Sequence, residues 1–580
     1  MDANVKRANE NAVRKVELFA WRLHVFALTI LCLAAYVPGI IRLPAVDRTE
    51  ATYAETTRDM VARGQWLDPR YGDTVHQFRP IGPYWAQGVA AKIAGESHAR
   101  DITVYRLPGL IAVTLAVVAL FWLSAPIVGQ SAALTASGLF AVAPLTVLLA
   151  QLAISESLSL LPAMIAMLAL LRIYVREDGR TDRTDTWMPA LFWIAIGFGM
   201  LLNALQTPVL IAATMIALFA IDRDLSWLKR TRPVVGLPVA IAIGSPWLIV
   251  RAHQDGVPFA GMGWGDFIDA LSGSQDMKLK AWPGTFLLAV VLGFLPGTAL
   301  IGPAVKRLWD TRTDRLARFL FAWIVGYIVY LELLSSKPGT YSVQVIFPAL
   351  AIAVALWINS GDAKRGLPKW HLMPWPPLAA MFAVALLAAP YFAASQLPSL
   401  AAFALSAVVA WLFFISASEG RALQFTDWAQ TGIAALGFFA VTLLAVILPS
   451  IDVAWPSRQI ARALSTCPNA KVAILGFREP TSYFILEAKR NLQTAETIAA
   501  AKPPVAIIEA RWLERYRSAL QSSPPAQGCI SAYNVMRGCR LEFTIFAGNG
   551  GGCSIPAEFV CRDSDLNPSA PAQSKLGNCD

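Results

Sequence analysis

The chain has 580 residues, of which 56% are hydrophobic and only 15% charged, and its mean hydropathy is +0.50. This composition excludes an ordinary soluble enzyme, because repeated apolar runs of about 20 residues are what a bilayer core about 30 Å thick requires. The net charge of +10 would suggest nucleic-acid binding in a soluble chain, but here an excess of Lys and Arg in cytoplasmic loops explains most of it.

The first apolar run, Leu18 to Ile41, follows a polar stretch that contains Lys6, Arg7, Arg14 and Lys15. No small-residue cleavage pattern follows the run, so we interpret it as an uncleaved first helix and not as a signal peptide. The basic residues before it place the N-terminus in the cytoplasm. The polar segment after it is therefore expected in the periplasm.

Further apolar runs bring the predicted number of transmembrane helices to about thirteen. They cover residues 107–127, 132–149, 158–175, 187–202, 208–221, 234–250, 285–305, 319–334, 343–358, 374–393, 400–415 and 432–448. Lys and Arg gather in alternate loops, at 176–183, 223–232, 306–318 and 364–369, whereas the loops at 151–155, 203–207 and 395–399 contain neither. The positive-inside rule assigns the basic loops to the cytoplasm, and an odd number of spans places the C-terminal region in the periplasm.

The C-terminal region from residue 455 is expected to form a small α/β domain. The runs KVAILGF and PVAIIEA are typical of strands, and SYFILEA and LERYRSALQ of helices. Six of the 7 cysteines lie here, at positions 467, 529, 539, 553, 561 and 579. An even set in an extracytoplasmic region favours disulfides over a zinc site, since no CxxC spacing is present.

The polar stretch from Asp47 to Gln87 is the main candidate for chemistry in the N-terminal half. Asp47 and Glu50 are three residues apart, so on a helical turn both carboxylates lie on one face, where they can activate a hydroxyl or bind a divalent cation. A capping box with Asp47 as the N-cap is the competing interpretation, and spacing alone favours it. Arg79, in a proline-fixed turn, suits a lipid phosphate. Tyr84, five residues further on, is a second candidate for contact with the lipid donor. The alternative is that Tyr84 anchors the chain at the membrane interface.

More polar groups are predicted on the same side of the membrane. Glu156 lies at the outer end of the fourth span, and Glu332 lies near the outer end of the ninth. Ionisable groups at such depth are costly and are functional candidates by default. Lys337 and Tyr341 flank a Pro-Gly turn, where they can contact a lipid phosphate.

The motifs resemble those of the GT-C glycosyltransferases, specifically the superfamily of protein O-mannosyltransferases and of the aminoarabinose transferases that modify lipid A. The resemblance rests on DRTEATYAETTRDMVARGQWLDPRYGD and FRPIGPYWAQ, together with RLPGL, AISESL, SPW, GFLPG and KPGTYSVQVIFPALAI. It covers about residues 18–448. The tail, with REPTSYF and AYNVMRGCRLEF, is similar to the C-terminal domain of alphaproteobacterial members.

The resemblance implies a GT-C transmembrane domain over residues 1–454, with its motif loop at 43–106, and a periplasmic α/β domain over 455–580. It implies an inverting transfer of one sugar from a polyprenyl-phosphate donor to an acceptor at the periplasmic face of the inner membrane. Lipid A or lipopolysaccharide is the expected acceptor, and protein O-glycosylation is the alternative. No cofactor is implied with certainty, and a divalent cation stays open.

The resemblance also implies roles for the candidate residues. Asp47 becomes the catalytic carboxylate, Glu156 matches the second acidic position, and Arg79 matches the motif lysine that holds the donor phosphate, with Lys337 and Tyr341 helping. An alignment of Tyr53-Ala54-Glu55 without a gap places Thr49 at the motif aspartate and leaves Asp47 two residues upstream. Glu50 therefore stays an alternative to Asp47.

A third hypothesis is a transporter or non-catalytic binding protein for lipid-linked sugars. Such a protein would line a path through its helices with polar groups, and no inverted repeat with broken helices is apparent. Geometry separates the hypotheses: a transferase requires Asp47, Arg79 and Glu156 in one outward-facing cavity.

Overall fold

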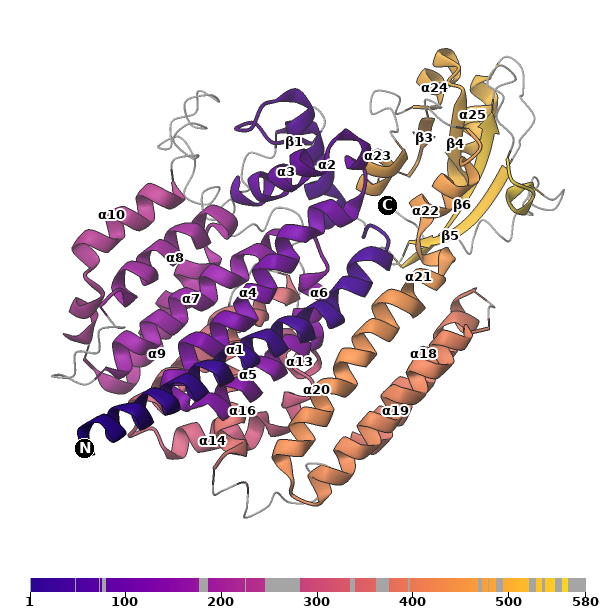
Figure 1. Ribbon diagram of the computed structural model, residues 1–580. Coiled ribbons are helices and arrows are strands. Elements are labelled where there is room, and N and C mark those ends of the chain that lie inside the picture. The colour runs from indigo at the N-terminus through magenta and orange to yellow at the C-terminus, as the bar shows by residue number, and fades with distance from the viewer. Residues whose placement is uncertain are drawn as a thin grey trace.

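The chain folds into a large bundle of helices with a smaller sheet-containing part at one end (Figure 1). The computed structural model describes residues 2–561 except 47, 72–73, 76–79, 177–185, 225, 246–281, 334–338, 361–362, 364–374, 395–396, 468–471, 478, 487–493, 521–527, 535–537 and 548–554.

The bundle consists of helices that follow the apolar runs of the sequence. Their bounds are α1 Asp2–Arg42, α4 Ile102–Val128, α5 Gln130–Val142, α6 Pro144–Ala150, α7 Ser155–Val175, α8 Met188–Asn203, α9 Gln206–Asp222, α10 Pro233–Gly244, α13 Thr285–Gly293, α14 Ile301–Asp310, α15 Arg315–Leu333, α16 Phe347–Ile358, α18 Trp375–Ala394, α19 Leu400–Arg421, α20 Phe425–Val441 and α21 Leu448–Ser450. A π-helical segment, Thr442–Ile447, joins α20 to α21. The helices α4, α5, α7 and α16 pack around one continuous apolar core.

The protein is a polytopic helical membrane protein. Among the described residues, 7 helices are long and apolar enough to cross a membrane, or up to 9 if each bent helix pair is one span. Shorter apolar helices are Met188–Asn203, Gln206–Asp222, Pro233–Gly244 and Met381–Tyr391. Each predicted span overlaps one of these helices or bent pairs, whereas the number of membrane crossings stays a prediction.

Two predicted spans are broken, which the hydropathy of the sequence did not indicate. The run at 132–149 forms α5 and α6, bent by 65°, and the run at 285–305 forms α13 and Gly297–Asp310, bent by 114°. Ala143 has φ −54° and ψ 128°, the extended conformation that Pro144 imposes on the residue before it. As a result, α6 leads into the turn at 151–154, which belongs to the candidate site.

Three loops that carry Arg meet at one end of the bundle. The backbone oxygen of Arg176, after α7, accepts hydrogen bonds from Arg230 at 2.7 Å and from Arg315 at 3.1 Å. Arg318, in the first turn of α15, forms an ion pair of 2.6 Å with Asp222 at the end of α9. Three of the four loops that the positive-inside rule assigns to the cytoplasm therefore lie together in the described part of the chain.

The segment after α1 forms a small layer over the opposite end of the bundle (Figure 1). It contains α2 Thr49–Arg63, the short antiparallel strands β1 Arg70–Tyr71 and β2 Thr74–Val75, and α3 Gly82–Ala94. Gly64 ends α2 with φ 68°, and its N–H bonds back to Met60 and Val61. Glycine adopts this left-handed conformation without steric cost. Helices α2 and α3 pack on each other, and α3 packs on α4.

The C-terminal part is a four-stranded sheet in the order β3-β4-β6-β5. Its strands are β3 Val472–Leu475, β4 Val505–Glu509, β5 Gly528–Asn534 and β6 Cys539–Ala547, and its helices are α22 Pro456–Ala463, α23 Pro480–Leu486, α24 Ala495–Ala501 and α25 Leu513–Ala519. Only β3 and β4 are parallel. Alternate residues of β3 face different apolar clusters, one with α22 and α23 and one with α24 and α25. Because both faces are covered, β3 and residues 505–508 of β4 are apolar, as the sequence indicated.

Disulfides hold this part of the chain, as predicted. Cys529 and Cys561 are bonded, with their Cα atoms 4.8 Å apart. Cys467 and Cys539 each also take part in a disulfide. Cys32, in α1, is a free and buried thiol.

Candidate functional site

The Glu50 carboxylate is buried in the first turn of α2 and accepts four hydrogen bonds. Its Oε1 accepts from Arg106 Nε at 2.8 Å and from the Ala153 N–H at 2.9 Å. Its Oε2 accepts from Arg106 Nη2 at 2.7 Å and from the Val46 N–H at 2.9 Å. A carboxylate offers about four lone-pair positions, so all positions of Glu50 are used inside the protein. This arrangement leaves Glu50 no lone pair with which to accept a proton from a substrate.

Arg106, in the first turns of α4, is the charged partner of the buried Glu50 carboxylate. Its side chain has no solvent exposure. Besides Glu50 it donates to the backbone oxygens of Ile40 at 3.2 Å, Leu43 at 2.6 Å and Pro44 at 2.9 Å. It therefore connects the end of α1, the start of the first loop and α4. Arg106 is not among the predicted site residues, although an arginine next to an apolar run indicates a buried partner.

Ala153 is held through both of its backbone polar groups by side chains of the first loop. Its N–H donates to Glu50, and its oxygen accepts from Gln87 Nε2 at 3.0 Å. The Oε1 of Gln87 in turn accepts from Thr57 Oγ1 at 3.0 Å. The turn at 151–154 is thereby fixed against α2 and α3.

This turn leads directly into α7, whose first turn carries Glu156. Glu156 is half-buried, and its Oε2 accepts a hydrogen bond from Ser155 Oγ at 3.1 Å. Because Ala153 and Glu156 are only three residues apart, the contacts of Glu50 and Gln87 place this second acidic candidate beside the first loop.

Tyr84 and Tyr341 belong to one apolar cluster that also contains Tyr53 and Ile154. The rings of Tyr53 and Tyr84 lie 5.2 Å apart between centroids. Tyr84 has no solvent exposure, so its alternative as an interfacial anchor is wrong. The first loop, the turn before Glu156 and the 3-10 helix Thr340–Ile346 therefore meet in one place.

Asp47, Arg79 and Lys337 lie outside the described residues, and their roles stay predictions. The neighbours of Asp47 are described: Val46 donates to Glu50, and Arg48 has φ 64°. Helix α2 begins at Thr49 with Arg48 as its N-cap and no side-chain cap. The capping-box alternative required Asp47 at that position, so the structure does not support it.

Glu332, the other acidic candidate at the outer helix ends, has contacts that indicate a structural role. It accepts hydrogen bonds from the N–H groups of Gly284, Phe286 and Leu287 at 2.9, 3.1 and 3.3 Å. These N–H groups lie at the N-terminus of α13. A carboxylate at a helix N-terminus accepts from unpaired N–H groups and stabilises the helix. Glu332 thus fixes the start of α13 from α15.

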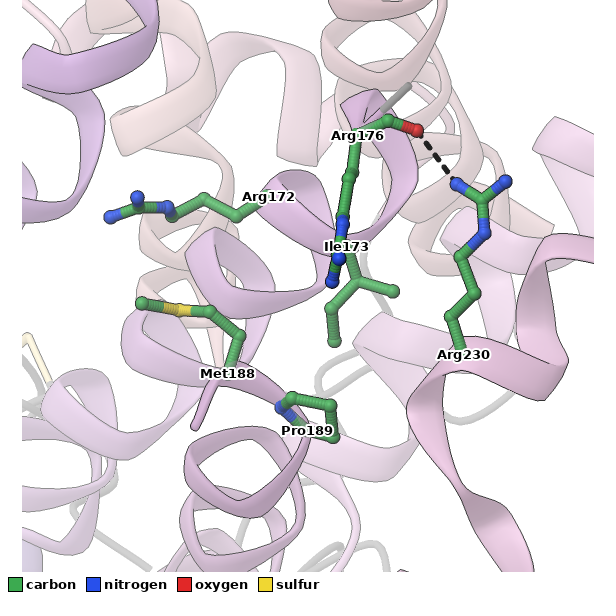
Figure 2. Close-up of a pocket in the computed structure, with 6 residues that line it drawn as sticks. All are labelled: Arg172, Ile173, Arg176, Met188, Pro189 and Arg230. Carbon is green, nitrogen blue, oxygen red and sulfur yellow. Dashed lines mark hydrogen bonds between the residues drawn. The ribbon is translucent and has the colours of Figure 1, made fainter. Parts of the chain in front are cut away.

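The described residues contain no group of three or more His, Cys, Asp or Glu side chains that could hold a metal ion. A small pocket lies elsewhere, lined by Arg172, Ile173, Arg176, Met188, Pro189 and Arg230 (Figure 2). It lies at the end of α7 that is opposite to Glu156, roughly 24–30 Å away along the helix at about 1.5 Å per residue. The pocket therefore belongs to the end of the bundle where the Arg-bearing loops meet.

Comparisons with known proteins give matches over parts of the sequence. Residues 78–250 match the family model of dolichyl-phosphate-mannose-protein mannosyltransferases. The chain is 25% identical over 316 residues to the undecaprenyl phosphate-alpha-4-amino-4-deoxy-L-arabinose arabinosyl transferase of Erwinia tasmaniensis, which covers 53% of this chain and 54% of that protein. The transferase 1 of the same name from Pseudomonas fluorescens is 23% identical over 305 residues, covering 52% and 53%. The chain thus spans about half the length of these relatives.

Solved structures extend the likeness to nearly the whole chain. The crystal structure of ArnT from Cupriavidus metallidurans in the apo state superposes with a TM-score of 0.68 at 15% identity, covering 92% of this chain and 98% of that one. The structure of the same protein bound to undecaprenyl phosphate gives a TM-score of 0.67 at 17% identity, covering 90% and 98%. At this identity the likeness establishes the fold.

Proposed function

We propose that this chain, a protein of the ArnT-like GT-C superfamily, is a glycosyltransferase that moves a sugar from a polyprenyl-phosphate donor to lipid A or lipopolysaccharide. The reaction takes place at the periplasmic face of the bacterial inner membrane, and it inverts the sugar's anomeric centre. The N-terminus and the Arg-bearing loops lie in the cytoplasm. About thirteen spans connect them to the active site and to the periplasmic domain over 455–580.

The observation that supports the proposal most strongly is the convergence of three separate motif segments. Glu50 and Gln87 of the first loop hold the two backbone polar groups of Ala153, three residues before Glu156. Tyr341 reaches the same apolar cluster as Tyr84. The resemblance had assigned catalysis and phosphate binding to these segments, and they lie together at the end of the bundle that is opposite to the Arg-bearing loops.

The contacts of Glu50 support different roles for the two carboxylates. Since Arg106, Ala153 and Val46 occupy its oxygens, Glu50 positions the loop and Asp47 acts on the acceptor. Asp47 orients the acceptor hydroxyl and takes its proton as the oxygen attacks the anomeric carbon. Glu156, in the first turn of α7, helps to orient the acceptor.

The bond from the anomeric carbon to the polyprenyl phosphate breaks as the new glycosidic bond forms. Negative charge then grows on the departing phosphate, which positive side chains stabilise. We expect Arg79 to supply this charge, with Lys337 and Tyr341 helping. A phosphate leaves without protonation, so no general acid is needed.

Protein O-glycosylation is the second candidate. It is favoured by the match of residues 78–250 to the family model of protein mannosyltransferases. Both candidates use a polyprenyl-type phosphate donor and differ only in the acceptor.

Binding of undecaprenyl phosphate to the purified full-length chain tests the donor part of the proposal. We expect saturable binding in detergent, and Arg79→Ala should weaken it about 10- to 100-fold. The reason is that a hydrogen bond to a charged group contributes about 1.5–3 kcal/mol, and 1.4 kcal/mol is about tenfold in affinity.

The matched control is Arg63→Ala, since Arg63 is an arginine of the same loop that bonds to Gln65 and lies near Asp68. Binding by this variant should equal that of the wild type. Equal binding by Arg79→Ala would remove Arg79 from the donor site, and the absence of saturable binding by the wild type would contradict a polyprenyl-phosphate donor.

A further inference from the structure

The C-terminal part of the chain contacts the first loop directly, through α23 and the residues around it (Figure 1). Phe484 of α23 is completely buried in a cluster with Ala54 of α2 and with Tyr105 of α4. The rings of Phe484 and Tyr105 meet edge to face, 5.5 Å apart between centroids. Arg100 adds a hydrogen bond of 3.1 Å to the backbone oxygen of Phe484. This contact fixes α23 against the catalytic loop.

Glu479, immediately before α23, extends this contact to the residue beside Asp47. Its Oε2 lies 3.7 Å from Arg48 Nε, and the exposed fractions of the two side chains are 3% for Glu479 and 38% for Arg48. Its Oε1 accepts a hydrogen bond from Asn534 Nδ2 at 3.1 Å, on strand β5. One oxygen of the Glu479 carboxylate is therefore bonded to the sheet, and the other faces the Arg48 guanidinium.

Arg48 has a backbone conformation that needs such support. Its φ of 64° is uncommon for a residue with a side chain. Its backbone oxygen accepts from the Thr52 N–H at 2.8 Å, which begins α2. Conformations of this kind persist when the surroundings determine them, and they cluster at functional sites.

We infer that Glu479 is a positioning residue for catalysis, acting through Arg48 on the turn that carries Asp47. Asp47 stands in the sequence between Val46, which is bonded to Glu50, and Arg48, which is paired with Glu479. One of these anchors comes from the membrane domain and the other from the C-terminal part. The inference rests on the proposed function, because it takes Asp47 as the group that acts on the acceptor.

The test compares Glu479→Gln with the wild type in the full-length protein. Glutamine keeps the size of the side chain and an oxygen for Asn534 but removes the charge opposite Arg48. We expect kcat for sugar transfer to fall at least about tenfold, since a small misplacement of a catalytic group has effects of this size. The KM for the polyprenyl donor and the melting temperature should stay at the wild-type values. Arg48→Ala should lower kcat similarly, and the double variant no further.

Asp452→Asn is the matched control. It removes an ion pair with Arg462 in the same region and should leave kcat unchanged. Unchanged kcat in Glu479→Gln, or losses that add in the double variant, would overturn the inference.

Hydrogen exchange separates this inference from the proposed function. In Glu479→Gln, the peptide that covers residues 46–52 should exchange faster than in the wild type, whether or not a transfer product is found. Exchange at the wild-type rate would show that Glu479 does not hold this turn. A wild-type protein that makes no product would contradict the proposed function alone.

Discussion

Asp47→Asn is expected to lower the rate of sugar transfer by about 100- to 10,000-fold, the usual contribution of a positioned acid or base. Asparagine has nearly the same size but cannot take the proton of the acceptor hydroxyl. Glu50 cannot replace it, because its two oxygens already accept from Arg106, Ala153 and Val46. The rate is measured with membranes that contain equal amounts of each variant.

Asp101→Asn is the control for this change in the same loop. The Asp101 side chain caps α4 by accepting from the Thr103 N–H at 2.9 Å, and asparagine caps a helix about as well. This variant should transfer sugar at the wild-type rate. Full activity in Asp47→Asn would instead move the catalytic role to Glu156.

Glu50→Ala is expected to destabilise the membrane domain by about 3–5 kcal/mol, the cost of removing one partner of a buried ion pair. The Arg106 side chain, without solvent exposure, would keep its charge and lose two charged hydrogen bonds. The N–H groups of Val46 and Ala153 would lose their acceptor as well. The loss should appear as a lower midpoint of thermal unfolding in detergent.

A double-mutant cycle decides whether the pair acts as a unit. Arg106→Ala should destabilise the chain by a similar amount, and Glu50→Ala with Arg106→Ala by clearly less than the sum of the single changes. The control is Glu496→Gln, which removes an exposed pair with Arg515 and should change stability by no more than about 1 kcal/mol. Additive losses at Glu50 and Arg106 would contradict a coupled anchor.

The sequence predicted those features that depend on local composition. Apolar runs located the helices of the bundle and the strands β3 and β4, because both faces of these strands are buried. The hairpin of β5 and β6 was not foreseen, because the buried positions of β5 are Gly528, Ile530, Ala532 and Asn534. Its alternation of burial is therefore not visible as an alternation of hydropathy. The bends at Pro144 and near Pro296 were also missed, because average hydropathy does not register where a helix must break.

The sequence predicted which segments form the candidate site, but it did not predict which residues of these segments contact each other. The charge of the Asp47 to Gln87 stretch singled out the loop, whereas the partner of Glu50 lies 56 residues away. The docking of α23 joins residues as far apart as Arg100 and Phe484, 384 positions. Spacing rules compare neighbours on one helix or strand and contain no information on such pairs.

Mass spectrometry of lipopolysaccharide and envelope glycans tests the transferase assignment most directly. Cells that lack the gene would be compared with the same cells complemented by the wild type or by Asp47→Asn. We predict that one sugar disappears from lipid A or core lipopolysaccharide upon deletion and returns with the wild type only. Loss of a sugar from envelope proteins instead would name the protein acceptor, whereas glycans unchanged by the deletion would contradict the assignment and favour a transport or binding role.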